Sequence, residues 1–333
     1  MNNVKLLAGR SNLPLAESIA KCLGKPLISR IIEPFPSTEI RVEINESIRG
    51  CDVFIVQTAS ADTENSVNDY IIETLLLIDA CKRSGAESVS VIWTALPYQR
   101  SDKKDKPRVP IGASMIANIL KAAGCNRIIS MDLHSGQIQG FANIPFDNLY
   151  GIKLHIDELN RSVFVKEAKQ LSQEEINEKY ILVSLDVGGA KRIRDFAKRL
   201  KMSHAIMDKQ RDYSKNSEVT KSVIIGDSVK DKIAICIDDM CDTAGTLIAG
   251  ITDLKEHGAA SAIVVVTHGI FSGPAFIRIN KCDFIDKVIV INTLDQTQNL
   301  LRTDKLIVVD SGPLFAEIIE KIIGGGSISK SFI

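Results

Sequence analysis

An α/β fold with a mostly parallel sheet is predicted by two features of this 333-residue sequence. Short runs rich in valine and isoleucine recur along the chain, and apolar runs of this length are typical of strands buried on both faces of a parallel sheet. Between these runs lie segments with the apolar spacing of helices that bury one face. Strands that alternate with helices in this way are joined by crossovers and pair in parallel.

The predicted strands, in chain order, are residues 4–8, 53–56, 89–93, 128–129, 181–183, 233–237, 262–266, 288–291 and 306–309. The predicted helices are 70–83, 113–123, 189–200 and 246–257. The first of these helices has apolar residues at 71, 72, 75, 76, 78 and 80, which form one broad face. A glycine-rich run at 324–327 predicts a loose turn.

The length of the chain predicts about two domains. Residues 85–94 and 258–267 echo one another, because each begins with Gly-Ala, follows a predicted helix and runs into a predicted strand. Any helix-to-strand turn that ends in glycine gives a similar pattern, but the echo agrees with two similar α/β domains in tandem. The weakly patterned stretch 150–171 marks the boundary, so we expect domains at 1–150 and 151–310, with a C-terminal helix and tail at 311–333.

The charges of the chain balance, with 41 basic and 41 acidic residues. General nucleic-acid binders and membrane-surface proteins need a basic excess, so we expect neither nucleic acid nor membrane as a partner. No apolar run approaches a membrane span, and the first residues lack the apolar stretch of a signal peptide. The seven cysteines form no CxxC pair, which argues against a zinc knuckle or a disulfide framework. Free thiols favour a reducing compartment, so we expect a cytoplasmic protein.

The strongest functional motif follows the predicted strand 233–237 and reads Asp-Asp-Met-Cys-Asp-Thr-Ala-Gly-Thr from Asp238 to Thr246. Open α/β folds bind ligands at the carboxyl ends of their parallel strands. The backbone N–H groups and hydroxyls of the Thr-Ala-Gly-Thr loop suit a phosphate at a helix N-terminus. The adjacent carboxylates of Asp238 and Asp239 suit sugar hydroxyls. A helix N-cap needs only one such residue, so the motif predicts a site for a ribose with a 5-phosphate.

Other polar groups also follow predicted strands. Asp132 and His134 come after 128–129, and Asp186 comes after 181–183. A carboxylate or histidine at a strand end is a candidate for binding metal or phosphate, although a lone histidine is more often structural and an aspartate there also serves a strand-to-helix turn.

Two basic segments complete the set of candidates. Residues 100–108 hold five basic and two acidic residues in a segment that prolines bracket as a loop, which suits either a polyphosphate or plain solvation. Lys209 and Arg211 follow the apolar stretch 205–207, where a surface charge pair is the simpler reading. The polar loop after them, to about residue 220, is of the kind that closes over a reaction that must exclude water.

Together these motifs resemble those of the ribose-phosphate pyrophosphokinase (phosphoribosyl pyrophosphate synthase) family. The motif 238–246 resembles the ribose-5-phosphate loop that this family shares with phosphoribosyltransferases. Further segments select the family: 35–39 with 48–53 resemble its N-terminal nucleotide segment, 97–105 its ATP-binding motif, 131–141 its signature region and 267–274 another block. The resemblance covers nearly the whole chain. It implies two tandem phosphoribosyltransferase-like domains, the first on the ATP side and the second on the ribose 5-phosphate side.

The resemblance implies that the anomeric hydroxyl of ribose 5-phosphate attacks the β-phosphorus of MgATP, giving phosphoribosyl pyrophosphate and AMP. It assigns catalysis to Lys209 and Arg211, and Mg²⁺ to His134 and Asp186, with Asp132 as a secondary candidate. The implied ATP contacts are Phe35, Ser37, Thr38, Glu39, Arg100, Ser101 and His134. The implied ribose 5-phosphate contacts are Asp238, Asp239, Asp242, Thr243, Ala244, Gly245 and Thr246. The resemblance also implies homo-oligomers, as dimers that assemble into hexamers, and inorganic phosphate as an activator.

The sequence departs from the family pattern in a few places. Ser37 stands where Asp or Asn is usual, Ser101 where Gln is usual, and Asn143 where many relatives carry Asp. The first two changes lie on the nucleotide side, and the third weakens a metal role at that position. Extra residues relative to the family are expected around 165–178.

These departures leave two alternatives beside an active enzyme. One is a regulatory paralogue that assembles with an active subunit, against which the intact Lys209, Arg211 and ribose loop count. The other is a phosphoribosyltransferase acting on a base, against which the ATP-side motifs count, because a single such domain would suffice for that reaction.

Overall fold

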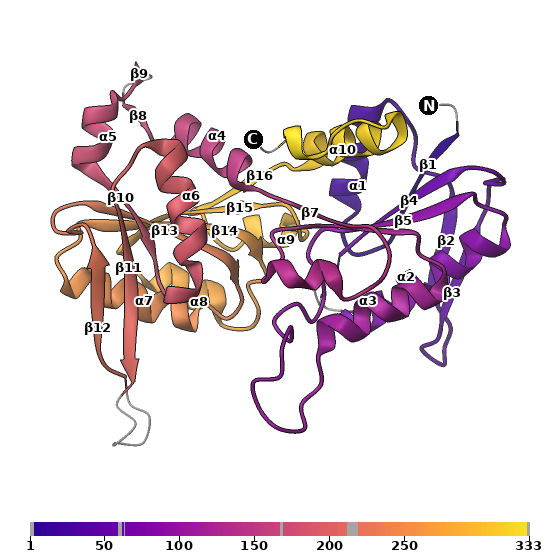
Figure 1. The fold of residues 1–333 in the computed structure, drawn as a ribbon, viewed down its shortest axis with the longest axis horizontal. Helices are drawn as coiled ribbons and strands as arrows, with labels where there is room; N and C mark the ends of the chain where they lie inside the picture. The colour runs from indigo at the N-terminus through magenta and orange to yellow at the C-terminus, as the bar shows by residue number, and fades with distance from the viewer. Residues whose placement is uncertain (1–2, 59–61, 63, 167–168, 212–218, 332–333) are drawn as a thin grey trace. The chain divides into compact units, whose positions relative to one another are not determined.

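The computed structural model describes residues 3–58, 62, 64–166, 169–211 and 219–331, and only the backbone of Lys166, 209–211 and 219–222. The chain forms two compact units (Figure 1). Unit 1 consists of Met1–Gly151, Asn292–Asp295 and Asp310–Ile333, and unit 2 of Ile152–Ile291 and Gln296–Val309. Each unit is described on its own below.

Unit 1 is built on a five-stranded parallel sheet of order β1-β4-β5-β6-β7. Helices α2 and α3 cover one face of this sheet, and α1 and α10 cover the other (Figure 1). A two-stranded antiparallel hairpin, β2–β3, completes the unit. The strands are β1 Val4–Ala8, β2 Arg30–Pro34, β3 Ile40–Ile44, β4 Asp52–Gln57, β5 Ser88–Trp93, β6 Arg127–Met131 and β7 Phe146–Leu149. The helices are α1 Leu13–Leu23, α2 Val67–Arg83, α3 Gly112–Ala123, α10 Gly312–Gly324 and the short 3-10 turns η1 Gly136–Gly140 and η3 Ser329–Ser331.

Unit 2 is built on a seven-stranded sheet of order β12-β11-β10-β13-β14-β15-β16, in which only β12 runs antiparallel to its neighbour. Helices α4 and α6 lie on one face, and α7 and α8 on the other (Figure 1). The strands are β10 Tyr180–Ser184, β11 His204–Arg211, β12 Val219–Gly226, β13 Ile233–Cys241, β14 Ser261–Gly269, β15 Ile285–Ile291 and β16 Leu306–Val309. The helices are α4 Ile152–Ser162, α5 Gln173–Lys179, α6 Ala190–Leu200, α7 Gly245–Glu256, α8 Ala275–Lys281, α9 Thr297–Leu300 and the 3-10 turn η2 Val187–Gly189.

The predicted fold class is confirmed, and each predicted strand and helix coincides with an observed one. The strands read as continuous apolar runs because both of their faces are buried. In β13, for example, Ala234 and Cys236 belong to one core cluster while Ile235 and Ile237 belong to the cluster on the opposite face. Within the described residues, no helix is both long and apolar enough to cross a membrane.

The two echoing segments share their local structure. Gly85 and Gly258 both take a positive φ, of 78° and 86°, just after a helix. The following amides close the same turn, with 3.1 Å from Ala86 N to Cys81 O and 3.1 Å from Ala259 N to Leu254 O. In each case a left-handed glycine ends a helix and the chain enters a parallel strand, β5 or β14.

The segment expected to hold extra residues lies within unit 2. It forms a small hairpin of β8 Val165–Lys166 and β9 Lys169–Gln170, followed by α5. Ser172 and Glu175 form a capping box at the start of α5, which satisfies two backbone N–H groups there. Ile176 is 7% exposed and joins the core cluster on the α4–α6 face. The segment therefore contributes to the core on this face of unit 2.

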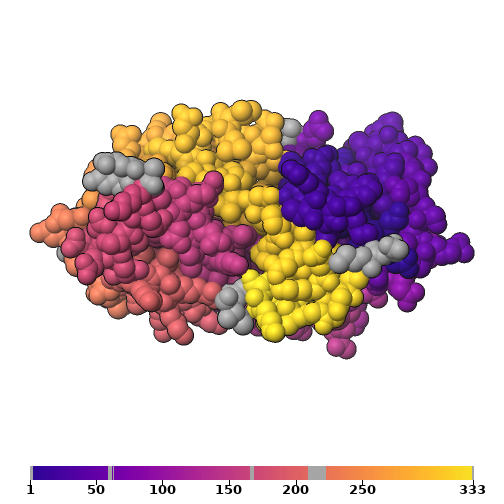
Figure 2. All heavy atoms as spheres, turned by 90° about the horizontal axis from the view of Figure 1, so that it is seen from above, coloured from indigo at the N-terminus to yellow at the C-terminus, as the bar shows by residue number. Residues whose placement is uncertain are grey.

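Helix α10 packs against α1, so the part of the chain that follows unit 2 returns to unit 1 (Figures 1 and 2). The contact is close: a Cβ at Gly312 would lie 2.1 Å from Ser18 Oγ, so no larger residue fits there without displacement. Ser18 Oγ donates to Asp310 Oδ2 at 2.5 Å, and Ser311 N donates to Asn292 Oδ1 at 2.8 Å. A close helix contact and a polar network together hold this return in place.

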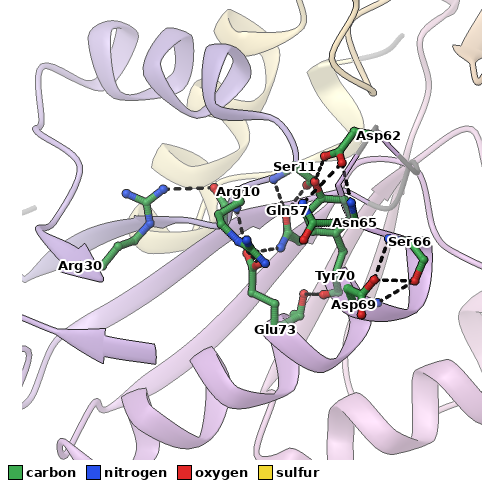
Figure 3. A network of polar contacts seen from close by, with 12 residues as sticks. Arg10, Ser11, Arg30, Gln57, Asp62, Asn65, Ser66, Asp69, Tyr70 and Glu73 are labelled. Atoms are coloured by element: carbon green, nitrogen blue, oxygen red, sulfur yellow. Dashed lines mark hydrogen bonds and ion pairs between the residues drawn. The ribbon is translucent and has the colours of Figure 1, made fainter. Parts of the chain in front are cut away.

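A buried carboxylate organises a second polar network in unit 1 (Figure 3). Glu73, on α2, is fully buried. Its Oε1 accepts from Arg10 N and from Gln57 Nε2, both at 2.8 Å, and its Oε2 accepts from Arg10 Nε at 2.7 Å. Because a buried charge is tolerated only when it is paired, this network fixes the loop after β1 against β4 and α2.

We predict that Arg10→Met lowers the free energy of unfolding by about 3 kcal/mol, because it leaves the Glu73 carboxylate buried without its cation. The matched control is Arg83→Met, which removes the exposed pair of Arg83 with Asp79 on the same helix. That change should cost at most about 0.5 kcal/mol. Urea unfolding of the two variants measures both; equal losses would contradict the role given to this network.

Candidate functional site

Parallel pairing brings three polar strand ends together at one edge of the unit 2 sheet. Val183 on β10 pairs with Cys236 on β13, and Met240 on β13 pairs with His268 on β14. The residues that follow β10 and those that end β13 therefore lie side by side. In open α/β sheets this carboxyl edge is where ligands bind.

Strand β13 is longer than predicted. The sequence places Asp238 and Asp239 after the strand, but β13 continues to Cys241 because β14 is equally long and pairs with it as far as Gly269. Successive residues of a strand point to opposite faces, so the two carboxylates leave the backbone on different sides. Asp239 is 5% exposed, while Asp238 is half-buried.

The loop after β13 connects directly to α7. Ala244 is the N-cap residue and takes a left-handed conformation with φ of 58°. Arg278, on α8, donates from Nη1 to the carbonyl oxygen of Thr243 at 2.7 Å. The loop therefore has a fixed shape and ends at the N-terminus of a helix, where free N–H groups attract an anion. The structure brings together all the residues predicted for ribose 5-phosphate at this junction: Asp238, Asp239, Asp242, Thr243, Ala244, Gly245 and Thr246.

An arginine that the sequence analysis did not single out contacts the acidic pair. Arg192 lies in the first turn of α6, with Nη1 3.1 Å from Asp238 Oδ1 and Nη2 3.8 Å from Asp239 Oδ2. Its side chain is 27% exposed. No local pattern could have identified it, since it is 46 residues from Asp238 along the chain.

The carboxyl of Asp238 is held in an environment that disfavours its charge. Burial raises the pKa of Asp238, and the adjacent Asp239 carboxylate raises it further. The Arg192 guanidinium acts in the opposite direction and lowers that pKa. The ionised form of Asp238 therefore depends on the nearby Arg192 guanidinium.

Asp186 is placed by the turn that follows β10. Its Oδ1 accepts from Gly189 N at 3.0 Å, and Ser184 Oγ donates to the Asp186 carbonyl at 2.8 Å. The turn is η2, which leads directly into α6. Asp186 therefore acts as an N-cap, which is the simpler of the two roles that the sequence suggests for it. It also lies at the same edge of the sheet as Asp238.

In unit 1 the segment around Arg100 is tied to the segment around His134. Gln99 Oε1 accepts from His134 N at 3.0 Å, and Gln137 Nε2 donates to Asp102 Oδ2 at 3.2 Å. Gln99 and Asp102 are both buried. Two buried side chains thus fix two motifs that are far apart in the sequence as neighbours. The segment 97–110 contains turns and no helix or strand, as predicted.

Ser101 and Asp132 have structural partners in the same region. Ser101 Oγ accepts from Gly112 N at 3.0 Å at the start of α3. Asp132, with φ of 40°, accepts from Gly151 N at 3.1 Å. These contacts hold the backbone on either side of Arg100 and His134.

Residues 35–39, which are predicted to contact ATP, form the turn of the β2–β3 hairpin. Phe35 N donates to Glu39 O at 2.7 Å, and Thr38 has φ of 72°. Ser37 Oγ donates to Glu39 Oε2 at 2.9 Å, and the Phe35 side chain is 48% exposed. These residues thus present an exposed aromatic ring and polar groups on one turn.

The predicted catalytic cations Lys209 and Arg211 lie at the end of β11, and their side chains are outside the described residues. The predicted loop to about residue 220 is wrong in extent, because Val219 and Thr220 belong to β12. Backbone pairing of β11 with β12 takes these residues into a hairpin. Residues 212–218 lie outside the described part of the chain.

Comparison with known proteins decides the family. Residues 4–124 match the family model of the N-terminal domain of ribose phosphate pyrophosphokinase, and residues 215–333 match that of the phosphoribosyl synthetase-associated domain. The phosphoribosylpyrophosphate synthetase of Mycobacterium smegmatis is 34% identical, with a TM-score of 0.85, over 97% of this chain and 100% of that one. The chain belongs to the ribose-phosphate pyrophosphokinase family.

Membership in the family gives the chain its activity, that of a ribose-phosphate diphosphokinase. No observation favours a regulatory paralogue or a base phosphoribosyltransferase. The adenine phosphoribosyl transferase of Trypanosoma brucei is 16% identical over 44% of this chain and 66% of that one, with a TM-score of 0.29. A hypoxanthine phosphoribosyltransferase of Staphylococcus aureus is 21% identical over 43% and 78%, with a TM-score of 0.26. These partial matches carry no argument about function.

A buried histidine of this pyrophosphokinase lies near the acidic pair's cation. His155, on α4, is 2% exposed, and its Nε2 lies 3.3 Å from Thr267 Oγ1. Its Nδ1 is buried without a hydrogen-bond partner. Burial lowers the pKa of His155 to about 3, and the positive Arg192 and His268 add to this effect. The folded protein therefore keeps this imidazole neutral.

The His155 pKa predicts a loss of stability in acid. The folded pKa lies below the ordinary value of 6.5, so the unfolded chain binds the proton first as the pH falls. Above pH 6.5 this histidine does not lower the free energy of unfolding. Between pH 6.5 and pH 5, protonation of the unfolded chain should lower the free energy of unfolding by about 2 kcal/mol. Urea unfolding from pH 8 to pH 5 should show a shallower loss for His155→Gln than for the wild type. His257→Gln, at an exposed position after α7, is the control, and equal slopes for all three proteins would refute the prediction.

Proposed function

We propose that this diphosphokinase binds ribose 5-phosphate at the carboxyl edge of the unit 2 sheet and ATP on residues of unit 1. The observation that supports the ribose site is the continuous run from β13 into α7. It offers carboxylates for hydroxyl groups and, next to them, a fixed loop and helix N-terminus for a phosphate. The ATP contacts would come from Phe35, Ser37, Thr38 and Glu39 on the β2–β3 turn and from Arg100, Ser101 and His134.

In the proposed reaction the 1-hydroxyl of ribose 5-phosphate attacks the β-phosphorus of ATP. The new bond joins that oxygen to the β-phosphorus, the bond from the β-phosphorus to the α,β-bridging oxygen breaks, the hydroxyl proton is released to solvent, and AMP leaves. The chain's own contribution is positioning and charge. Asp238 and Asp239 would hold the ribose hydroxyls, and Lys209 and Arg211 would stabilise negative charge on the transferred group.

The residues present fit a magnesium ion. Mg²⁺ takes one or two carboxylates together with phosphate oxygens of the substrate, so it does not need a cluster of protein ligands. No group of three or more histidine, cysteine or acidic side chains with metal-site geometry occurs among the described residues. In unit 1, His134 and, secondarily, Asp132 would hold one ion, and in unit 2 Asp186 would hold a second. Magnesium when bound neutralises phosphate charge.

The setting of the enzyme also belongs to this proposal. Resemblance to the family supports a cytoplasmic homo-oligomer, formed of dimers that assemble into a hexamer, with inorganic phosphate as an activator. The free thiols of Cys236 and Cys241 agree with a reducing compartment.

The proposed reaction is tested by incubating the pure protein with MgATP and ribose 5-phosphate and measuring AMP. We expect AMP release that requires both substrates and Mg²⁺. Lys209→Ala should lower kcat about 10²- to 10³-fold, because it removes a cation from the transition state. Lys198→Ala, at an exposed position on α6, is the matched control and should leave kcat unchanged. No AMP under any phosphate or magnesium concentration would refute the function.

The ribose site has a separate test in Asp238→Asn. We expect the KM for ribose 5-phosphate to rise at least about 10-fold, because a charged hydrogen-bond acceptor is lost, while the KM for ATP stays unchanged. The raised pKa of Asp238 also means that its ionised form destabilises the fold as the pH rises above its ordinary value. The variant should therefore unfold at a higher temperature than the wild type at pH 8. Unchanged kinetics for ribose 5-phosphate would place the sugar elsewhere.

A further inference from the structure

Arg192 is built into the acidic pair from a neighbouring strand-to-helix connection. Helix α6 starts at Ala190, directly after the turn that carries Asp186, and Arg192 occupies its first turn. From there the guanidinium spans both carboxylates, with Nη1 3.1 Å from Asp238 Oδ1 and Nη2 3.8 Å from Asp239 Oδ2. Planar guanidinium groups suit such a two-point contact, which a lysine cannot reproduce.

Each of the two carboxylates is also fixed by a backbone N–H group. Asp238 Oδ1 accepts from Asp239 N at 2.8 Å, and Asp239 Oδ1 accepts from Met240 N at 3.0 Å. The Arg192 contact to Asp238 falls on the same oxygen as the backbone contact. The guanidinium and the backbone together therefore set the rotation of the Asp238 carboxylate and direct its second oxygen.

We propose that Arg192 is a positioning residue for ribose 5-phosphate, which holds the Asp238–Asp239 pair in the orientation in which its carboxylate oxygens accept hydrogen bonds from sugar hydroxyls. The inference rests on the proposed ribose site and adds a residue from outside the β13–α7 motif. Arg192 acts through the two carboxylates and need not touch the substrate.

The physical reason is the electrostatics of two adjacent carboxylates. Burial and mutual repulsion both favour a proton on the pair, and a protonated carboxyl loses charge as an acceptor. A fixed guanidinium offsets part of that cost before the sugar arrives. The sugar then meets acceptors that are already aligned, so less free energy is lost on binding.

Arg192 also connects two parts of the site. It follows the Asp186 turn by a few residues and contacts the end of β13, and β10 and β13 are neighbours in the sheet. A shift of α6 would therefore move the acidic pair and the Asp186 turn together. This coupling separates Arg192 from an ordinary ion pair of the surface.

The test compares three variants of the full-length protein. Arg192→Ala removes the cation, Arg192→Lys keeps the charge without the planar two-point contact, and Arg194→Ala is the matched control. Arg194 lies on the same helix, but its Nε donates to Ala190 O within that helix. The KM for ribose 5-phosphate, the KM for ATP and kcat are measured for each, and ribose 5-phosphate binding is measured by calorimetry without ATP.

We expect Arg192→Ala to weaken ribose 5-phosphate binding about 10- to 100-fold, as for the loss of a charge-assisted contact, with the KM for ATP changed less than about twofold. Arg192→Lys should recover part of that loss, and Arg194→Ala should match the wild type. A loss of affinity for both substrates alike, or no change for ribose 5-phosphate, would overturn the proposal.

Two further measurements keep the result interpretable. If Arg192→Ala unfolds at a lower temperature, adding Asp238→Asn should restore part of the loss, because the unpaired carboxylate is then gone; no recovery would overturn the ion-pair role. Calorimetry on the wild type separates this inference from the proposed function: if ribose 5-phosphate binds and only Arg192→Ala loses it, the positioning role stands even if no AMP is formed.

Discussion

The carboxyl edge of a buried parallel sheet is the constraint on which this structure depends. Both faces of β10, β13 and β14 are covered by helices, so polar side chains have room only where the strands end. Parallel pairing then places those ends side by side, whatever their distance in the sequence. The acidic pair, the Asp186 turn and the Arg192 guanidinium meet for this reason.

In unit 1, buried polar side chains hold the loops in place. Gln99 and Asp102 are buried and form hydrogen bonds with the segment around His134. Glu73 accepts a hydrogen bond from the loop after β1. Such buried polar side chains are costly unless they are paired. Here their pairing also fixes loops that would otherwise have many conformations. A ligand that binds to loops already in place loses less free energy in ordering them.

The apolar runs were sufficient to predict nine of the twelve strands described in the two large sheets, because burial on both faces leaves a plain signature in the residues themselves. The strands β7, β11 and β12 were not predicted. The length of β13 was not predictable, since Asp238 and Asp239 look like the end of a strand until the pairing with β14 is known. The β2–β3 hairpin was missed, although the alternation of Ile40, Val42 and Ile44 with polar residues is a signal that could have revealed β3. Arg192 had no signal at all, because its partners are set by the pairing of strands and not by spacing.

The packing of α10 on α1 has a consequence for the synthesis of the protein. Helix α1 emerges early from the ribosome, with Leu15 and Ile19 on the face that it buries, while α10 is made only after all of unit 2. During translation nearly all of unit 2 emerges in one stretch and can fold, but unit 1 waits with an uncovered apolar face until α10 is made. The cell thus completes unit 1 last, although it begins to make this unit before unit 2.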